Sequence, residues 1–175
     1  MSIDFIKSKI ASVPDFPKPG IIFRDITPLL ADSQGLRKTA EAMADVIKQK
    51  GIKPTIIAGT ESRGFIFGVA LAEALGLGFV PVRKPGKLPR ETYSVSYDLE
   101  YGSDSLEIHK DAFSVDDNVL VVDDLLATGG TAKATVELIE KTQAKVAALI
   151  FLIELEGLPG REVLNGYDVS ALLKF

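Results

Sequence analysis

The sequence predicts a single α/β domain built on a mostly parallel sheet flanked by helices, and three observations lead to this prediction. Short apolar runs rich in β-branched residues alternate along the chain with amphipathic or apolar helical segments. Several of these runs are apolar at nearly every position, as expected of strands covered on both faces. The length of 175 residues suits one domain that buries about two-thirds of its unfolded surface.

A short helix, an irregular arm and an amphipathic helix are expected to precede the alternation of strands and helices. A short helix is predicted over residues 2–12, and the Pro and Gly residues between 14 and 28 then indicate an irregular arm. Apolar residues at helical spacing between 34 and 50 predict an amphipathic helix that ends at Gly51.

Strands and helices alternate through the rest of the chain. A turn over 59–64 leads into a buried helix over 65–75, and a further helix is predicted over 131–143. The predicted strands cover residues 55–58, 78–82, 119–122 and 146–153. We expect a ligand site at the carboxyl ends of these strands.

Residues 83–110 break this pattern. The segment Arg83–Arg90 holds four basic residues and no acidic one. After it, apolar and polar residues alternate in two runs, around Tyr93 and around Leu106. This alternation predicts a long antiparallel ribbon inserted into the α/β core, and excursions of this length in compact domains are often functional.

The composition excludes several kinds of chemistry. The chain has no cysteine and one histidine, His109, so disulfides, thiolate metal sites, cysteine nucleophiles and multi-histidine sites are ruled out. Its 20 Lys+Arg and 24 Asp+Glu give a net charge of −4, which argues against a general nucleic-acid partner. No apolar run has the length of a membrane span, and the first 16 residues contain no apolar run of the kind found in a secretory signal, so we expect a cytoplasmic location and no membrane partner.

The strongest functional signal is the string VLVVDDLLATGGT, residues 119–131. A buried strand ends in Asp123 and Asp124, and a turn of small residues then opens a helix, whose first N–H groups are unpaired and electropositive. These features predict a phosphate cradle made of five residues, Ala127, Thr128, Gly129, Gly130 and Thr131. The two carboxylates suit sugar hydroxyls or a hydrated Mg²⁺. Neither a Walker A loop nor a G-x-G-x-x-G motif occurs.

The string resembles the phosphoribosyl-diphosphate motif of type I phosphoribosyltransferases, in the form found in members that use adenine. Further segments are similar to that family's segments in the same order: Pro14–Ile26, Ser62–Phe65, Arg83–Pro89, and Leu99–Gly102 followed by Leu106–Asp111. The resemblance implies the family's fold. It places a hood at 1–32 together with the C-terminal segment, a core at about 33–156 and a flexible ribbon at about 84–110.

The resemblance also implies a reaction. Adenine would be joined to 5-phosphoribosyl 1-diphosphate, giving AMP and diphosphate in purine salvage. Mg²⁺ would be held through substrate and waters near Asp123 and Asp124, which would also fix the ribose hydroxyls, with no direct protein ligand. A homodimer is implied, in which one basic residue reaches into the neighbouring site.

Individual residues receive roles by the same resemblance. Glu100 is the expected catalytic group for the adenine proton, with Glu107 as a weaker candidate, and Tyr101 belongs to the lid. A strained or cis peptide is implied at Glu61–Ser62. The remaining expected contacts are Arg63, Arg83, Lys84 and Lys87 for diphosphate, and Ile22, Phe23 and Arg24 for adenine.

Three alternatives stay open at this point. The first is the same chemistry on hypoxanthine, guanine, xanthine or orotate, which would need a different base pocket. The second is a non-catalytic regulator that binds phosphoribosyl diphosphate. The third is a structural α/β domain without a ligand, which the 13-residue string disfavours. Whether Glu100 or backbone groups dominate base activation is also open.

Overall fold

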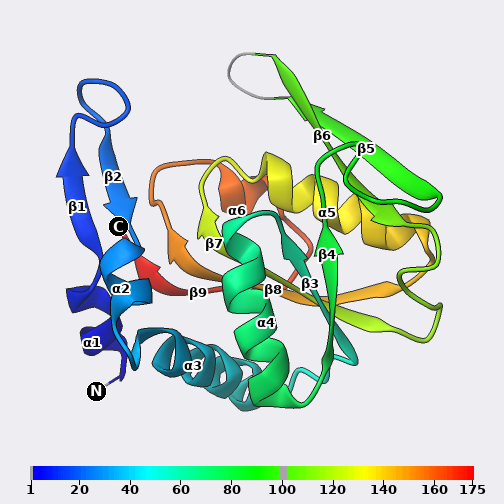
Figure 1. The fold of residues 1–175 in the computed structure, drawn as a ribbon, viewed down its shortest axis with the longest axis horizontal. Coiled ribbons are helices and arrows are strands. Elements are labelled where there is room, and N and C mark those ends of the chain that lie inside the picture. The colour runs from blue at the N-terminus through cyan, green and yellow to red at the C-terminus, as the bar shows by residue number, and fades with distance from the viewer. Residues whose placement is uncertain (1, 99–101) are drawn as a thin grey trace.

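A five-stranded parallel sheet forms the centre of the computed structural model, which describes residues 2–98 and 102–175 (Figure 1). The strand order is β4-β3-β7-β8-β9, and every neighbouring pair is parallel. The strands are β3 (Ile56–Thr60), β4 (Gly78–Val82), β7 (Asn118–Leu126), β8 (Lys145–Glu154) and β9 (Val169–Lys174). The predicted fold class is therefore confirmed.

One face of this sheet is covered by α1 (Ser2–Ser8), α3 (Gly35–Gln49) and α4 (Arg63–Leu75). Successive residues of a strand point to opposite faces, so Ile150 and Leu152 of β8 pack with Met43 and Phe67 in this layer. α4 ends at Gly76, which has a φ of 67° and so adopts the left-handed conformation that suits glycine at a helix end.

The other face is covered by α5 (Gly130–Lys141) and by the predicted ribbon, which consists of β5 (Thr92–Asp98) and β6 (Ser103–His109). Leu106 and Ile108 alternate with more exposed residues and are fully buried in the cluster that α5 shares with the sheet. The base of the ribbon is therefore part of the core, and its far end extends beyond the sheet (Figure 1).

The prediction for the N-terminal segment is wrong in two respects. The helix ends at Ser8 and not at residue 12, and the arm is not irregular, because it contains a hairpin of β1 (Ala11–Pro14) and β2 (Ile22–Asp25), followed by α2 (Thr27–Ala31). The proline-rich stretch forms the turn of this hairpin. Gly20 donates its backbone N–H to the Asp15 carboxylate at 2.8 Å, so the side chain of Asp15 closes the turn.

The strand predicted over residues 119–122 is also longer than expected, since β7 continues through the two aspartates to Leu126. It does so because β8 runs alongside to Glu154 and pairs with it, with Asp123 opposite Phe151 and Leu126 opposite Glu154. Asp123 and Asp124 thus lie within the strand.

The C-terminal segment contains a short helix, α6 (Gly160–Val163), and the edge strand β9. Because β9 pairs with β8, this segment, which the resemblance groups with the hood, contributes to the main sheet. Its last residue, Phe175, lies 4.3 Å from the guanidinium carbon of Arg24 in β2, so the segment also contacts the N-terminal hairpin. In the described part of the chain, no helix has the length and apolar character needed to cross a membrane.

Candidate active site

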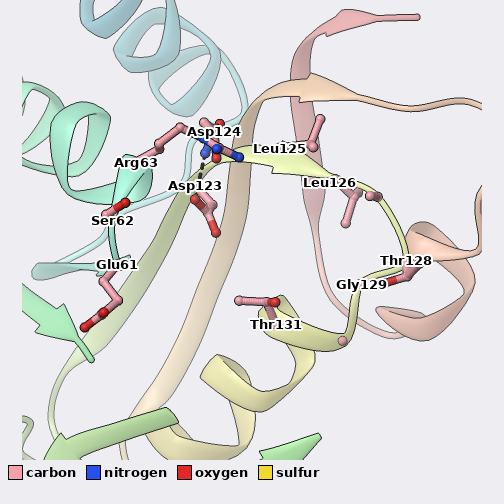
Figure 2. Close-up of a pocket in the computed structure, with 12 residues that line it drawn as sticks. Glu61, Ser62, Arg63, Asp123, Asp124, Leu125, Leu126, Thr128, Gly129 and Thr131 are labelled. Atoms are coloured by element: carbon pink, nitrogen blue, oxygen red, sulfur yellow. Dashed lines mark hydrogen bonds and ion pairs between the residues drawn. The ribbon is translucent and has the colours of Figure 1, made fainter. Parts of the chain in front are cut away.

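Two stretches of chain, 61–63 and 123–131, enclose a cavity of about 320 Å³ (Figure 2). The first stretch leads from the carboxyl end of β3 into α4, and the second leads from the end of β7 into α5. The cavity thus lies at the carboxyl edge of the sheet, where the sequence predicts a ligand site. It brings together Asp123, Asp124 and all five residues of the predicted phosphate cradle with Arg63.

Loop 127–131 forms one end of this cavity. Gly129 precedes α5 with a φ of 87°, a left-handed conformation that glycine adopts without steric cost. Within the described residues, no side chain caps the N-terminus of α5. The first N–H groups of the helix therefore keep their capacity to donate to a ligand, and the helix dipole adds positive potential. Such an end suits a phosphate group.

Asp123 and Asp124 form the floor of the cavity and differ in surroundings. The Asp124 carboxylate accepts a hydrogen bond from Arg63 Nε at 2.5 Å. Asp123 Oδ1 accepts the backbone N–H of Asp124 at 2.9 Å, and its side chain projects into the open space toward Thr131 (Figure 2). Desolvation and the charge of Asp124 raise the pKa of Asp123 well above its ordinary value. A cation or a hydroxyl donor at this point would relieve that cost.

The first residues of α4 approach the aspartates closely. A Cβ at Gly64 would lie 2.8 Å from Asp123 Oδ1 and 3.1 Å from the carbonyl oxygen of Val122, so only glycine fits there without movement. The peptide between Glu61 and Ser62 is cis, as the resemblance implies.

The basic segment Arg83–Arg90, called here the basic run, does not line the cavity, but Glu61 connects it to the cavity. The Glu61 carboxylate accepts hydrogen bonds from Arg83 Nε at 2.7 Å and from the Lys84 backbone N–H at 2.8 Å. Desolvation raises the pKa of Glu61 and is the largest single influence, but the two hydrogen bonds and the positive charges nearby together hold this pKa below the ordinary value. Lys87 is exposed, and its charge contributes to the same lowering.

The role of Glu61 in holding the basic run is not evident from the sequence. Its partner Arg83 is 22 residues away, and no local pattern indicates the pairing. A second partnership of this kind joins Lys84 to the ribbon, where its ammonium group contacts the Asp104 carboxylate.

A smaller apolar pocket of about 50 Å³ adjoins the cavity and shares Arg63, Asp124 and Leu125 with it. Phe23 and Arg24, two of the predicted adenine contacts, line this pocket together with Ile153 and Leu155. The third predicted contact, Ile22, is 51% exposed and does not line it. The guanidinium of Arg24 donates to Ser12 Oγ at 2.5 Å and stacks over Phe175.

Glu100 and Tyr101 lie outside the described residues. The weaker candidate, Glu107, exchanges two backbone hydrogen bonds with Arg83, at 2.9 and 2.7 Å, and its carboxylate accepts the N–H of Gly86 at 3.3 Å. These contacts fix the base of the ribbon beside the basic run and give Glu107 a structural partner. His109 also lies at the ribbon base, where its Nδ1 is 3.2 Å from Arg90 Nη2.

Comparison with known proteins gives consistent results. The family described as the phosphoribosyl transferase domain matches residues 26–171. The adenine phosphoribosyltransferase of Francisella tularensis subsp. tularensis is 85% identical over 175 residues, which is all of both chains. A crystal structure of adenine phosphoribosyltransferase from Thermoanaerobacter pseudethanolicus superposes with a TM-score of 0.94, at 53% identity and 99% coverage of each chain. The Saccharomyces cerevisiae enzyme, solved with an imino-altritol bisphosphate and adenine, has a TM-score of 0.94, at 42% identity and 98% coverage of each chain.

Proposed function

The chain belongs to the phosphoribosyltransferase family, and we propose that its site transfers phosphoribosyl from 5-phosphoribosyl 1-diphosphate to adenine, giving AMP and diphosphate. The observation that supports this proposal most strongly is the junction of two pockets. One pocket is polar and ends at a helix N-terminus, and the other is apolar and is lined by the aromatic ring of Phe23. Three shared residues join them, Arg63, Asp124 and Leu125. A sugar phosphate in the first would therefore meet a flat base in the second.

Loop 127–131 is proposed to bind the 5′-phosphate through backbone N–H groups and the hydroxyls of Thr128 and Thr131. Asp123 and Asp124 are proposed to accept hydrogen bonds from the ribose hydroxyls. The contact between Asp124 and Arg63 sets the orientation of both side chains, so that Arg63 faces the boundary between ribose and diphosphate. Positioning of this kind lowers the barrier of a displacement reaction without a covalent intermediate.

The basic residues Arg63, Arg83, Lys84 and Lys87 are proposed to stabilise charge on the departing diphosphate. Arg83 and Lys84 are held by Glu61, whose lowered pKa keeps it ionised at neutral pH. Glu61 thus fixes the direction of Arg83 before substrate binds and so reduces the reorganisation that the reaction needs.

The residues at the cavity fit a Mg²⁺ that is held mainly by substrate and water. Mg²⁺ prefers oxygen ligands and retains several waters, and the Asp123 and Asp124 carboxylates supply oxygens at the cavity floor. Among the described residues, no cluster of three or more His, Cys, Asp or Glu side chains could hold a metal ion. When bound, the ion would neutralise negative charge on the diphosphate.

Adenine is proposed to stack on Phe23, with the backbone of Ile22 and Arg24 at its edge. A carbonyl acceptor there would favour a 6-amino over a 6-oxo purine. The Arg24 side chain already contacts Ser12 and Phe175, so we assign the contact with adenine to the Arg24 backbone. Glu100 is proposed to manage the adenine proton and Tyr101 to cover the reactants. The enzyme is proposed to be a cytoplasmic homodimer.

A base-competition assay tests this function. Purified protein with 5-phosphoribosyl 1-diphosphate and Mg²⁺ is offered adenine, hypoxanthine, guanine, xanthine and orotate in turn. We expect AMP and diphosphate in equal amounts from adenine and at least about 100-fold lower kcat/KM for the other bases. Preference for another base would reassign the substrate, and absence of any nucleotide product would refute the enzymatic function. Near-normal turnover in both Glu100→Gln and Glu100→Ala would remove Glu100 as the acid or base.

A further inference from the structure

The short helix α6 packs directly against loop 127–131 (Figures 1 and 2). A Cβ at Gly160, the first residue of α6, would lie 2.5 Å from the carbonyl oxygen of Ala127 and 2.8 Å from Leu126 Cδ1. A Cβ at Gly129 would lie 3.0 Å from Gly160 Cα and 3.1 Å from Val163 Cβ. Two buried glycines thus allow two backbones to meet with no side chain between them.

The helix is held in this place by Arg161. Its guanidinium donates Nε and Nη2 to the two carboxylate oxygens of Glu154, at 2.5 and 2.7 Å, and donates Nη1 to the Val169 carbonyl at 3.0 Å. Two parallel bonds between a guanidinium and a carboxylate fix direction as well as distance. Glu154 is only 7% exposed. The hydrogen bonds from Arg161 are the main reason that the pKa of Glu154 lies below its ordinary value.

Glu154 is itself placed at the start of the loop. It pairs with Leu126 across β7 and β8, and the next residue, Leu155, donates its N–H to the Leu126 carbonyl at 3.0 Å. The ion pair therefore links α6 to the strand position from which loop 127–131 departs. Contacts from α6 reach the loop at Ala127 and Gly129, and the ion pair fixes α6 relative to the end of β8.

We infer that α6 positions loop 127–131 for the 5′-phosphate, with Gly160 and Arg161 as positioning residues that do not touch the substrate. A loop that binds through backbone N–H groups depends on its shape, since an amide that is displaced or tilted away from the ligand makes a weaker hydrogen bond. The inference rests on the proposed function, because it takes the ligand of this loop to be a phosphate group.

Calorimetric titration with two ligands tests the inference, with ribose 5-phosphate probing the loop and diphosphate probing the basic side. In Gly160→Ala we expect the Kd for ribose 5-phosphate to rise at least about tenfold, the loss of one hydrogen bond to a charged group, while the Kd for diphosphate stays within about twofold of wild type. Gly78→Ala is the matched control, because a Cβ there has its nearest neighbour at 3.8 Å.

Arg161 supplies a second set of variants that leaves the glycine contact intact. Arg161→Met removes the ion pair, and Arg161→Lys keeps the charge but not the paired bonds. We expect the Kd for ribose 5-phosphate to rise in the order wild type, Lys, Met, with diphosphate binding retained. These variants also test the inference if Gly160→Ala does not fold.

Two results would overturn the inference while leaving the proposed function intact. One is an unchanged Kd for ribose 5-phosphate in Gly160→Ala and Arg161→Met. The other is an equal loss of both ligands, which would indicate general distortion. If the wild-type protein itself fails to bind ribose 5-phosphate, the proposed function fails first, and the inference fails with it.

Discussion

The two sides of the cavity are prepared for anions in different ways. At loop 127–131 the proposed binding groups are mainly backbone N–H groups, joined by the hydroxyls of Thr128 and Thr131, and a positive-φ glycine and the packing of α6 set the shape of the loop. On the other side the proposed binding groups are charged side chains, Arg63 in the cavity and Arg83 beside it, and carboxylates already hold them: Asp124 holds Arg63, and Glu61 holds Arg83. The first side therefore depends on steric fit and the second on charge balance.

This difference separates the variants that should affect each side. Backbone N–H groups carry no net charge, so the loop should be sensitive to small volume changes and less affected by salt than the charged side chains are. Paired side chains lie partly in solvent, so the basic side should tolerate volume changes and respond to charge and ionic strength.

The largest expected effect comes from crowding the loop. Gly129→Ala places a methyl group 3.0 Å from the Gly160 backbone at a φ of 87°, so the loop must shift. We expect kcat/KM for 5-phosphoribosyl 1-diphosphate to fall on the order of 100-fold, equivalent to one or two hydrogen bonds to a charged group. Steady-state kinetics at two salt concentrations measure this loss, which should depend less on salt than the effects of charge substitutions on the basic side.

Gly51→Ala is the control for this prediction. Gly51 also has a positive φ, 67°, but nothing lies within 4 Å of a Cβ there, so the variant has the backbone strain without the crowding. If Gly51→Ala loses as much activity as Gly129→Ala, strain and not loop shape explains the effect.

Removing the charge of Glu61, on the basic side of the site, should strengthen the binding of diphosphate. Glu61→Gln keeps an acceptor for Arg83 and the Lys84 N–H but removes a negative charge beside the basic run. We expect diphosphate to inhibit Glu61→Gln about fivefold more strongly than wild type at low ionic strength, and this difference between the two proteins should shrink as salt is added. Glu73→Gln, near the far end of α4, is the control for a lost negative charge, and weaker inhibition in Glu61→Gln would contradict the prediction.

Ionisation of Asp123 should destabilise the folded, ligand-free protein. Because its pKa is raised in the folded protein, the folded state holds this proton more tightly than the unfolded chain. The stability of the ligand-free protein should therefore fall as pH rises from about 4 through the folded pKa. Asp123→Asn has no carboxylate to ionise at this position, so at pH 7 its Tm should exceed that of wild type.

Thermal unfolding of both proteins between pH 4 and 8 measures this difference. The gap should be smallest at pH 4 and should widen with pH. A gap that narrows or reverses as pH rises would show that the Asp123 carboxylate stabilises the ligand-free fold.

The smallest effect is expected where the basic run meets the ribbon. Asp104→Asn releases Lys84 from a partner whose side chain is 23% exposed, while that of Lys84 is 42% exposed. Partly exposed pairs contribute at most about 1 kcal/mol, so KM for 5-phosphoribosyl 1-diphosphate should change by about twofold or less at 0.15 M salt. A tenfold change would mean that this contact controls the ribbon.

The same contrast explains what the sequence could and could not predict. Loop 127–131 lies in one contiguous string, and strand, turn and helix start can each be recognised locally, so its place at the cavity follows from residue order. The pairing of Glu61 with Arg83 joins residues that only the alignment of β3 beside β4 brings together. No local pattern encodes it.

The contact between Gly129 and Gly160 was missed for a similar reason. Gly160 lies in a segment with little periodicity, and its role depends on how β8 and β9 place α6 beside the loop. The strand boundary at Asp123 was misplaced because charged residues usually end a buried strand, and here pairing with β8 overrides that preference. The N-terminal hairpin was missed because its prolines conceal two short strands that are stabilised mainly by each other.

Backbone amide shifts in ¹H–¹⁵N NMR spectra test the account most directly. The protein is titrated with ribose 5-phosphate and, separately, with diphosphate. The account predicts that ribose 5-phosphate moves the amides of residues 128–131 first, and that diphosphate moves those of 62–64 and Lys84. If both ligands move the same set of amides, or if ribose 5-phosphate leaves loop 127–131 unmoved, the division of the cavity into a backbone side and a charged side is wrong.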